Sequence, residues 1–314
     1  MRIAFLGTGD FAVPSLDALV ADGHRVVLVV SQPDRPAGRG RRVAPTAVHA
    51  AAERLGLPHL QSDDVNRDVA AAALVDAEIG VVIAFGQKLG PALLRALPHG
   101  FINVHASLLP RYRGAAPYQW AVLNGDATTG VTVFQLDERW DAGPIWRQVE
   151  TPIGATETAG ELHDRLAPLG AEALRGTLTD LAAGTLHPVA QDGTRASRAP
   201  KLSKLDGYVD WQAPASACVA RIHGLWPWPS ASCLLDRGDA APQERIQLAR
   251  AMLAPGAPRG GAGELDDDLC VCAGDGRVQL LEVKPAGGNC MRFEDFARGR
   301  RLAAGARLRR VTVE

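Results

Sequence analysis

Short apolar runs alternate with helix-like segments through the first 185 residues. Residues 3–7, 25–31, 79–85 and 101–105 form short, largely apolar runs, which are typical of buried strands, and the run at 25–31 is rich in β-branched side chains. Apolar positions with helical spacing separate them, at 13–22, 45–55, 66–75 and 91–97. This alternation predicts an α/β fold, a Rossmann-like, doubly wound and mostly parallel sheet.

The pattern changes after residue 185. A long helix is expected to begin at the capping box of Thr158 and Glu161 and to run to residue 183. The polar, basic segment 186–205 has no long period and reads as a linker. Short alternating runs then follow, separated by Gly, Pro and Asp, which predicts a small C-terminal β-barrel over 206–314.

Charge supports this division into a first domain at 1–185, a linker at 186–205 and a barrel at 206–314. Residues 1–197 hold 17 Lys and Arg against 21 Asp and Glu, a net charge of −4, whereas residues 198–314 hold 17 against 14, a net charge of +3. The stretch from Arg292 to Arg310 has seven arginines and two acids. The two parts therefore have different partners.

Several classes of protein are disfavoured by the composition. No run of 18 apolar residues exists, which predicts no membrane span. A glycine turn and Asp10 interrupt the apolar N-terminus before a signal-peptide core could form, so we expect a cytoplasmic protein. The five cysteines all follow residue 217 without a C-x-x-C pair, which disfavours a disulfide framework and a zinc site.

A glycine-rich turn after the first run offers one candidate function. Gly7, Gly9 and Ala12 satisfy the dinucleotide fingerprint G-x-G-x-x-A, and Asp34 follows the second run. Phe11 and Pro14 stand where a helix N-terminus would present free N–H groups to a pyrophosphate. A nicotinamide-dependent oxidoreductase is therefore an alternative, and a tight strand-to-helix turn is the favoured interpretation.

Asn103 and His105 alternate at the end of a predicted strand, so both side chains face the same way. They lie at the carboxyl edge of the sheet, where open α/β sheets bind ligands. An amide donor beside an imidazole suits acyl transfer, in which one group donates to a developing oxyanion and the other stabilises it or moves a proton. Asp141 follows another predicted strand and could orient the imidazole or accept a proton from an attacking amine.

These stretches together resemble a known family. The pattern N-x-H…SLLP-x-x-R-G-A-x-P…D-x-G, present from Asn103 to Gly143, is similar to the signature of the 10-formyltetrahydrofolate-dependent formyltransferases. Within that family the resemblance is to members that formylate the α-amine of methionyl initiator tRNA for translation initiation, and it covers essentially the whole chain. It implies a Rossmann-like formyltransferase domain followed by an oligonucleotide-binding-like barrel.

The resemblance also assigns residues. It implies that Asn103, His105 and Asp141 are catalytic. The residues it assigns to 10-formyltetrahydrofolate are Phe85, Gly86, Ser107, Leu108, Leu109 and Pro110. Arg39, Arg41 and Arg42 match a tRNA-contacting inserted loop. The implied co-substrate is the folate, with no metal, and the expected partner is initiator methionyl-tRNA, bound by a monomer.

Two further alternatives stay open. A formyltransferase acting on a sugar-nucleotide amine would share the Asn, His and Asp set but has less use for the arginine loop. A non-catalytic RNA-binding module would rest on the basic barrel alone. The chain also departs from the family pattern, with Gly9 where proline is usual, and with Arg139 and Trp140 where Gly-Leu is common before Asp141.

Overall fold

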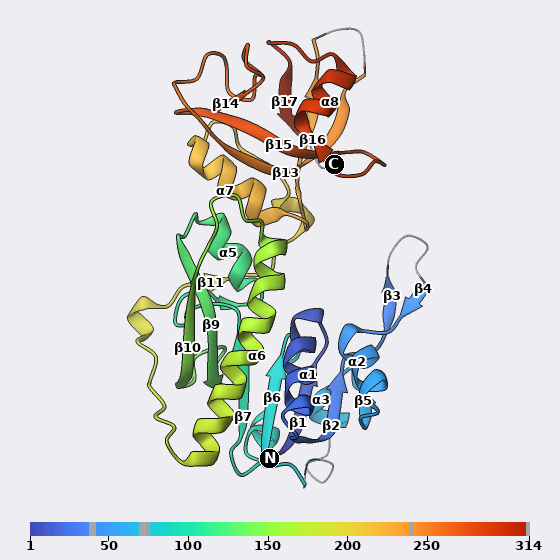
Figure 1. Cartoon of the computed structure of the whole chain (residues 1–314), viewed down its shortest axis with the longest axis vertical. Coiled ribbons are helices and arrows are strands. Elements are labelled where there is room, and N and C mark those ends of the chain that lie inside the picture. Colours follow the sequence, from blue (N-terminus) through green and yellow to red (C-terminus); the bar gives the residue numbers. More distant parts are fainter. Residues whose placement is uncertain (38–41, 69–73, 75, 239–241, 312–314) are drawn as a thin grey trace. The chain divides into compact units, whose positions relative to one another are not determined.

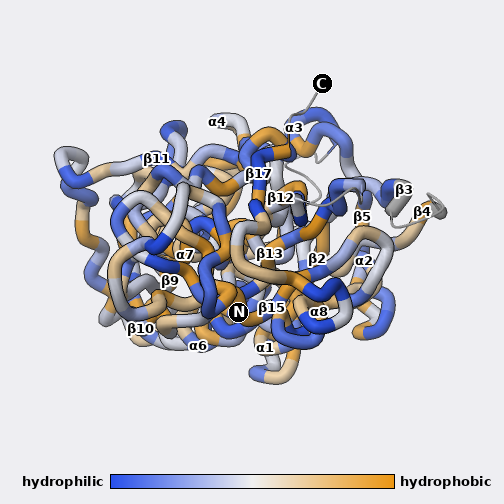
Figure 2. The backbone as a smooth tube through the Cα atoms, turned by 90° about the horizontal axis from the view of Figure 1, so that it is seen from above, coloured by the Kyte–Doolittle hydropathy of each residue, from blue (hydrophilic) through white to orange (hydrophobic). Residues whose placement is uncertain are grey.

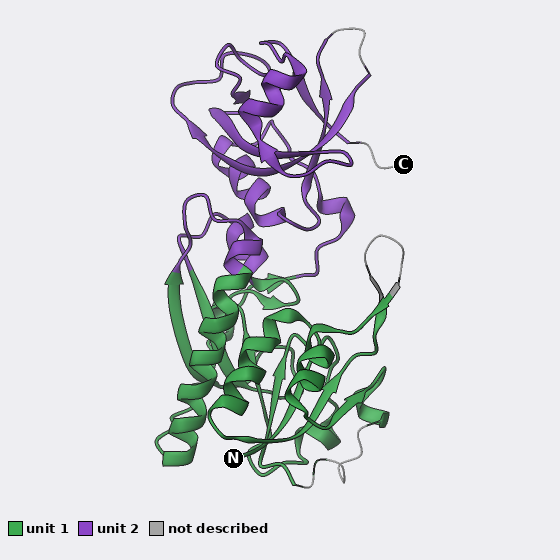
Figure 3. Ribbon diagram, turned by 45° about the vertical axis from the view of Figure 1, so that its right-hand side comes forward, with its two compact units in different colours: residues 1–117, 129–151, 163–199 green, residues 118–128, 152–162, 200–314 purple. Residues whose placement is uncertain are grey.

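The computed structural model describes residues 1–37, 42–68, 74, 76–238 and 242–311. Two compact units emerge: the first comprises 1–117, 129–151 and 163–199, and the second comprises 118–128, 152–162 and 200–314 (Figure 3). The domain boundaries predicted at residues 185 and 205 stay predictions.

The first unit contains a seven-stranded sheet in the order β10-β9-β7-β6-β1-β2-β5 (Figure 1). Its strands are β1 (Arg2–Gly7), β2 (Arg25–Ser31), β5 (His59–Gln61), β6 (Ile79–Ile83), β7 (Phe101–His105), β9 (Thr128–Gln135) and β10 (Ile145–Pro152). Strands β5, β2, β1, β6 and β7 are neighbours that pair in parallel, and β9 pairs antiparallel to β7. The predicted mostly parallel sheet is thus confirmed.

Both faces of this sheet are covered. On one face a buried apolar cluster joins Ala4, Leu6 and Phe101 to Val65 and Leu93, which lie on α3 (Val65–Asp68) and α4 (Pro91–Leu94). On the other face Val104 of β7 lies against Gly170 of the long helix α6 (Ala159–Ala183). Figure 1 shows α6 and α1 (Val13–Ala21) crossing the sheet on the same side. The arrangement is doubly wound, as predicted.

Other local predictions differ from the structure. The helix expected at 45–55 begins after the N-cap Thr46, giving α2 (Ala47–Leu55). Helix α3 is described only to Asp68, and most of the rest of the predicted 66–75 lies outside the described residues. The loop expected after β2 contains a separate two-stranded hairpin, β3 (Arg35–Ala37) and β4 (Arg42–Ala44). Its Gly- and Pro-rich sequence gives no clear strand signal.

Shorter elements complete the two units. They are η1 (Asp10–Ala12), β8 (Arg113–Gly114), α5 (Pro117–Leu123), η3 (Gly193–Arg195), β11 (Arg198–Ala199) and η4 (Lys204–Asp206). Strands β8 and β11 pair in parallel. At this bridge a Cβ on Gly114 would lie 2.5 Å from the carbonyl oxygen of Ala199, so only glycine allows the two backbones to approach.

The second unit is a small antiparallel barrel, as predicted. Its strands are β12 (Ala231–Asp236), β13 (Glu244–Ala254), β14 (Val271–Cys272), β15 (Arg277–Pro285), β16 (Met291–Arg292) and β17 (Arg307–Arg310), in the order β14-β15-β13-β12-β17 with β16 on β15. Glu264 bridges β17 and its neighbour Leu265 bridges β14, so one segment joins the two edges of the sheet. The apolar positions of these strands appear in orange in Figure 2.

Two helices accompany the barrel, α7 (Ala215–Leu225) and α8 (Phe293–Arg300). Charged side chains occupy half of the positions of α8, and Phe293 and Phe296 are its large apolar anchors. Strand β17 ends at Arg310, and residues 312–314 lie outside the described part. No helix among the described residues is both long and apolar enough to cross a bilayer.

A buried histidine connects α7 to the barrel. The side chain of His223 is 3% exposed, and its Nε2 accepts a hydrogen bond of 3.1 Å from the backbone N–H of Ala251. Ala251 lies at an irregularity of β13, where the pairing register with β15 shifts. Burial, the largest cause, lowers the pKa of His223 to about 4 from its ordinary value of 6.5. The folded chain therefore holds this imidazole neutral.

This arrangement predicts a pH dependence of stability. The unfolded chain protonates the imidazole near its ordinary pKa, so the stabilisation is fully present above that value and is lost as pH falls toward the folded value of about 4. Between about pH 7.5 and about pH 5 the loss is about 2 kcal/mol. In His223→Gln the side-chain carbonyl accepts from Ala251 without titrating, so urea unfolding of this variant should show a smaller loss. An equal loss in both proteins would contradict the assignment.

Candidate functional site

Asn103 and His105 lie on β7 and share the face that carries Phe101. Asn103 is partly exposed, and its side-chain amide makes no hydrogen bond within the described part of the chain. His105 is buried, with 7% of its surface exposed. The predicted pair is therefore present on β7. The amide of Asn103 is free, whereas the imidazole of His105 is held in place.

One nitrogen of His105 is already engaged. Its Nε2 lies 2.9 Å from the carbonyl oxygen of Tyr112, and its ring meets Phe134 edge-on at a centroid distance of 6.3 Å. A carbonyl oxygen only accepts hydrogen bonds, so Nε2 carries the proton. Nδ1 is the nitrogen left for chemistry.

Asp141 is also buried, with 8% of its surface exposed. Its Oδ2 accepts a hydrogen bond of 2.8 Å from the backbone N–H of Gly114. The Nε2 of Gln191 donates to the carbonyl oxygens of Asp141 and Gly143, at 2.9 and 2.8 Å, and so holds the loop after β9. The described side chains of Asp141 and His105 make no hydrogen bond to each other, and the hydrogen-bond partner of the imidazole is the carbonyl oxygen of Tyr112. A role of Asp141 in orienting the imidazole stays a prediction.

The segment from Tyr112 to Gly114 therefore contacts both groups, the imidazole through the Tyr112 carbonyl and the carboxylate through the Gly114 amide. Sequence reasoning missed this segment because it recruits backbone atoms, which no residue type reveals. Tyr112 and Asp141 both have positive φ angles, 62° and 47°. Such conformations are costly for residues other than glycine and cluster at functional sites.

The stretch predicted to bind folate after β7 is fixed by a buried hydroxyl. Thr132 of β9 is fully buried, and its Oγ1 donates to the carbonyl oxygen of Ser107 at 2.6 Å and accepts from the N–H of Leu109 at 3.1 Å. Gln148 donates to the same hydroxyl and to the carbonyl oxygen of Leu109. Ser107 and Leu109 are thus held inside, whereas Leu108 and Pro110 are partly exposed.

The other predicted folate residues follow β6. The ring of Phe85 is buried, and its carbonyl oxygen accepts a hydrogen bond of 2.8 Å from Nε2 of Gln32. Gly86 has φ 78°, and a Cβ there would lie 2.5 Å from the same Gln32 nitrogen. Glycine is therefore required at position 86, both for its positive φ and for the close approach of the Gln32 side chain. A hollow of about 330 Å³ that neither Phe85 nor Gly86 lines is formed by Asn66, Lys88, Leu89, Gly90, Pro91 and Glu138.

The predicted tRNA-contacting arginines are described only in part. Arg39 and Arg41 lie outside the described residues, and Arg42 begins β4. The dinucleotide alternative meets an obstacle nearby. The carboxylate of Asp34, which it would need for a ribose, accepts from the N–H of Thr46 at 3.0 Å and lies 3.0 Å from Nδ1 of His49.

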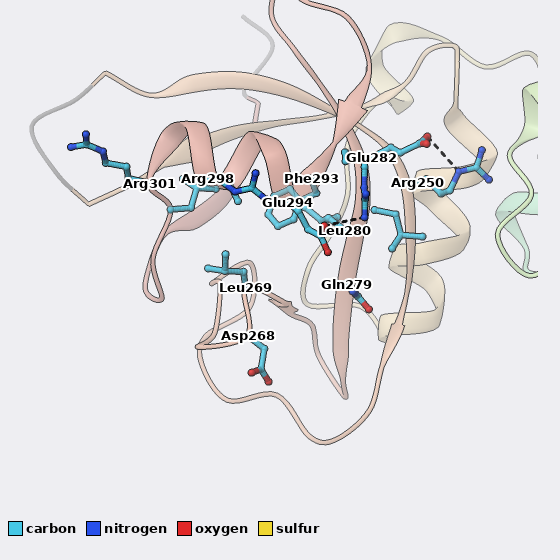
Figure 4. A pocket seen from close by; sticks show the side chains of 14 residues that line it. Arg250, Asp268, Leu269, Gln279, Leu280, Glu282, Phe293, Glu294, Arg298 and Arg301 are labelled. Atoms are coloured by element: carbon cyan, nitrogen blue, oxygen red, sulfur yellow. Dashed lines mark hydrogen bonds and ion pairs between the residues drawn. The ribbon is translucent and has the colours of Figure 1, made fainter.

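The barrel contains a larger hollow of about 750 Å³ between α8, β15 and the loop before β14. Figure 4 shows Phe293 and Leu280 inside it and arginines at its rim. Most of these cations are already paired: Arg250 with Glu282 at 3.4 Å, Arg292 with Glu294 at 3.0 Å and Arg298 with Asp295 at 3.4 Å. Among the arginines that line the hollow, all of which are described, only Arg301 has no carboxylate partner.

Comparisons with known proteins identify the family of the chain. A family model described as formyl transferase matches residues 1–178, and one described as formyl transferase, C-terminal domain, matches residues 201–301. The methionyl-tRNA formyltransferase of Heliobacterium modesticaldum is 46% identical over 316 residues, covering 98% of this chain and 99% of the relative. The enzyme of the same name from Methylobacterium sp. (strain 4-46) is 43% identical over 311 residues, covering 98% of this chain and 99% of that relative.

Solved structures share the fold at lower identity. WlaRD, a sugar 3N-formyl transferase determined in the presence of dTDP and 5-N-formyl-THF, has a TM-score of 0.64 at 16% identity and covers 90% of this chain and 98% of its own. HypX from Aquifex aeolicus, in complex with tetrahydrofolic acid, has a TM-score of 0.63 at 16% identity and covers 95% of this chain and 47% of its own. With two domain models matched in chain order and relatives above 40% identity along nearly its whole length, this chain belongs to the formyl transferase family.

Proposed function

We propose that this chain transfers the formyl group of 10-formyltetrahydrofolate to the free α-amine of methionyl initiator tRNA. The 46% identity to a methionyl-tRNA formyltransferase over 98% of the chain is the observation that carries the proposal. The chemistry of the site supports it, since the imidazole of His105 and the carboxylate of Asp141 both contact the Tyr112–Gly114 segment. The folate supplies the formyl group, and Gly86 and the Ser107–Pro110 stretch hold it.

Attack of the amine on the formyl carbon forms a tetrahedral oxyanion and leaves a proton to be removed. The free amide of Asn103 donates to the oxyanion, and each such preorganised donor contributes about 3–4 kcal/mol to transition-state stabilisation. Nδ1 of His105 takes part in the same step. It donates a hydrogen bond when the imidazole is charged, and it accepts a proton when the imidazole is neutral. Asp141 accepts the proton of the amine directly or through water, through Oδ1, which has no partner within the described residues.

We place the contact with tRNA phosphates at Arg39, Arg41 and Arg42, in a unit that is otherwise acidic. Arginine is suited to phosphate because its planar fork of donors matches the phosphate oxygens. We further propose that the chain acts as a monomer in the cytoplasm, where charged tRNA and folates occur together. The absence of a bilayer-spanning helix among the described residues is compatible with that placement.

The direct test is formyl transfer from 10-formyltetrahydrofolate to charged initiator tRNA, with uncharged tRNA as the control. We expect transfer only to the charged molecule, because the α-amine of the methionine is the nucleophile. A parallel reaction offers a sugar-nucleotide amine. Transfer to the sugar and not to methionyl-tRNA would replace the proposal with the sugar-nucleotide alternative.

Replacing Asn103 or His105 by alanine should lower kcat by about 100-fold or more, because each change removes a group that acts in the transition state. Affinity for charged tRNA should change little. Steady-state kinetics and tRNA binding measure the two quantities separately. Near-normal kcat in both variants would remove these residues from the catalytic role.

Two substitutions of Asp141 separate its role as a proton acceptor from its role as the hydrogen-bond partner of Gly114. Asp141→Asn keeps an oxygen that accepts from the Gly114 N–H but cannot take a proton, so kcat should fall nearly as far as in Asp141→Ala. Measuring kcat for both variants tests this expectation. If Asp141→Asn retains most activity while Asp141→Ala does not, the carboxylate only holds Gly114 in place.

A further inference from the structure

Residues 189–199 follow α6 within the first unit and are attached to the sheet and to the loop after β7. Figure 1 shows this segment between the end of α6 and β11, beside β10. At its first end the backbones of Val189 and Ile145 exchange two hydrogen bonds, of 2.7 and 2.8 Å. At its other end β11 pairs with β8. Gln191 lies between these two attachments.

The side-chain amide of Gln191 uses all of its hydrogen-bonding capacity. Its Oε1 accepts from Nε and Nη2 of Arg113, at 3.1 and 2.6 Å. Its Nε2 donates to the carbonyl oxygens of Asp141 and Gly143, at 2.9 and 2.8 Å. Because a guanidinium only donates and a carbonyl oxygen only accepts, one orientation of the amide satisfies all of these contacts. Arg113 therefore fixes which end of the amide meets the loop after β9.

Asp141 is consequently held through its backbone as well as through its carboxylate. Its φ angle is 47°, a conformation that is costly for residues other than glycine. The bonds from Gln191 hold the peptide groups that follow Asp141 and Gly143. The N–H of Gly114 holds Oδ2 of Asp141 at 2.8 Å. The position of the remaining carboxylate oxygen, Oδ1, is thus set from two directions.

The contacts of Gln191 would be purely structural if they served only to attach the segment 189–199. That attachment is already made by Val189 at one end, by β11 at the other, and by the contact of Oε1 with Arg113. The bonds donated by Nε2 are additional to it, and they reach across 50 residues of sequence to Asp141. They therefore act on the loop and not on the attachment of the segment.

We propose that Gln191 is a positioning residue for formyl transfer: by donating to the carbonyl oxygens of Asp141 and Gly143, it holds the Asp141 carboxylate where that group accepts the proton of the attacking amine. The inference rests on the proposed function, in which Asp141 is the proton acceptor. Gln191 acts through the loop alone and need not touch either substrate. A displacement of about 1 Å in a catalytic group lowers a rate by up to about 100-fold.

The decisive variant is Gln191→Glu, because it separates the two ends of the amide. A carboxylate still accepts from Arg113, so the segment stays attached, but it has no hydrogen to donate to the two carbonyl oxygens. We expect kcat for formylation of methionyl initiator tRNA to fall about 10- to 100-fold. The KM values for tRNA and for 10-formyltetrahydrofolate should stay within about twofold of wild type. Gln191→Ala should lower kcat to a similar extent.

Two controls separate positioning from general destabilisation. Thr194→Ala removes a hydroxyl of the same segment that donates to the exposed Asp192 at 2.6 Å, and it should leave kcat and both KM values unchanged. In a chain that carries Asp141→Asn, adding Gln191→Glu should lower kcat little further, because no proton-accepting carboxylate remains to be positioned.

The outcomes decide between the claims. If Gln191→Glu keeps kcat within about threefold of wild type, Gln191 does not position Asp141 and the inference is wrong. An equal loss in the wild-type and Asp141→Asn backgrounds would also overturn it, because Gln191 would then act through general structure. If Asp141→Asn alone retains most activity, the proton-accepting role falls and the inference falls with it, while the wild-type assay still establishes formyl transfer. A wild-type chain that does not formylate methionyl-tRNA would overturn the proposed function itself.

Discussion

The hydroxyl of Thr132 fixes the loop after β7, and the rest of the site depends on the position of that loop. It pairs with two backbone groups of the loop after β7 and accepts from Gln148, so all its hydrogen-bonding capacity is used inside the protein. Without it, a buried carbonyl and a buried N–H would be unpaired, at a cost of about 1–3 kcal/mol each. The β7–β9 register sets His105 opposite Thr132, so the same strand pairing places the imidazole and fixes the loop that returns to it.

That loop returns at Tyr112 and Gly114, which contact His105 on β7 and Asp141 in the loop between β9 and β10. The carbonyl of Tyr112 determines which nitrogen of His105 carries a proton, and the N–H of Gly114 keeps one oxygen of Asp141 occupied. Each catalytic candidate thus keeps one free atom: Nδ1 of the imidazole and Oδ1 of the carboxylate. Groups that are already held need little reorganisation when charge develops in the transition state.

The sequence could predict much of the frame and of the site. The strand that ends in Asn103 and His105 is read from its apolar run and its alternation, and the mostly parallel sheet follows from the strand–helix order. The contacts made by Tyr112, Gly114 and Thr132 could not be predicted, since they depend on backbone atoms and on the register of β9. The hairpin β3–β4 and helix α8 were not predicted. Gly and Pro weaken the strand signal of the hairpin, and the charged residues of α8 weaken its helical apolar pattern. Charge counting overstated the free cations of the barrel, where Arg300, Arg307 and Arg309 pair with Glu244, Glu264 and Asp236.

The central claim is that the Tyr112 carbonyl holds His105 with its proton on Nε2 and leaves Nδ1 free. Nitrogen chemical shifts of ¹⁵N-histidine-labelled protein report this tautomer directly, and His105→Gln identifies the signal by its loss. We predict that neutral His105 is protonated at Nε2, and that its Nδ1 shift is that of an unprotonated nitrogen. A neutral ring protonated at Nδ1 would contradict the account, because Nε2 could then no longer donate to Tyr112.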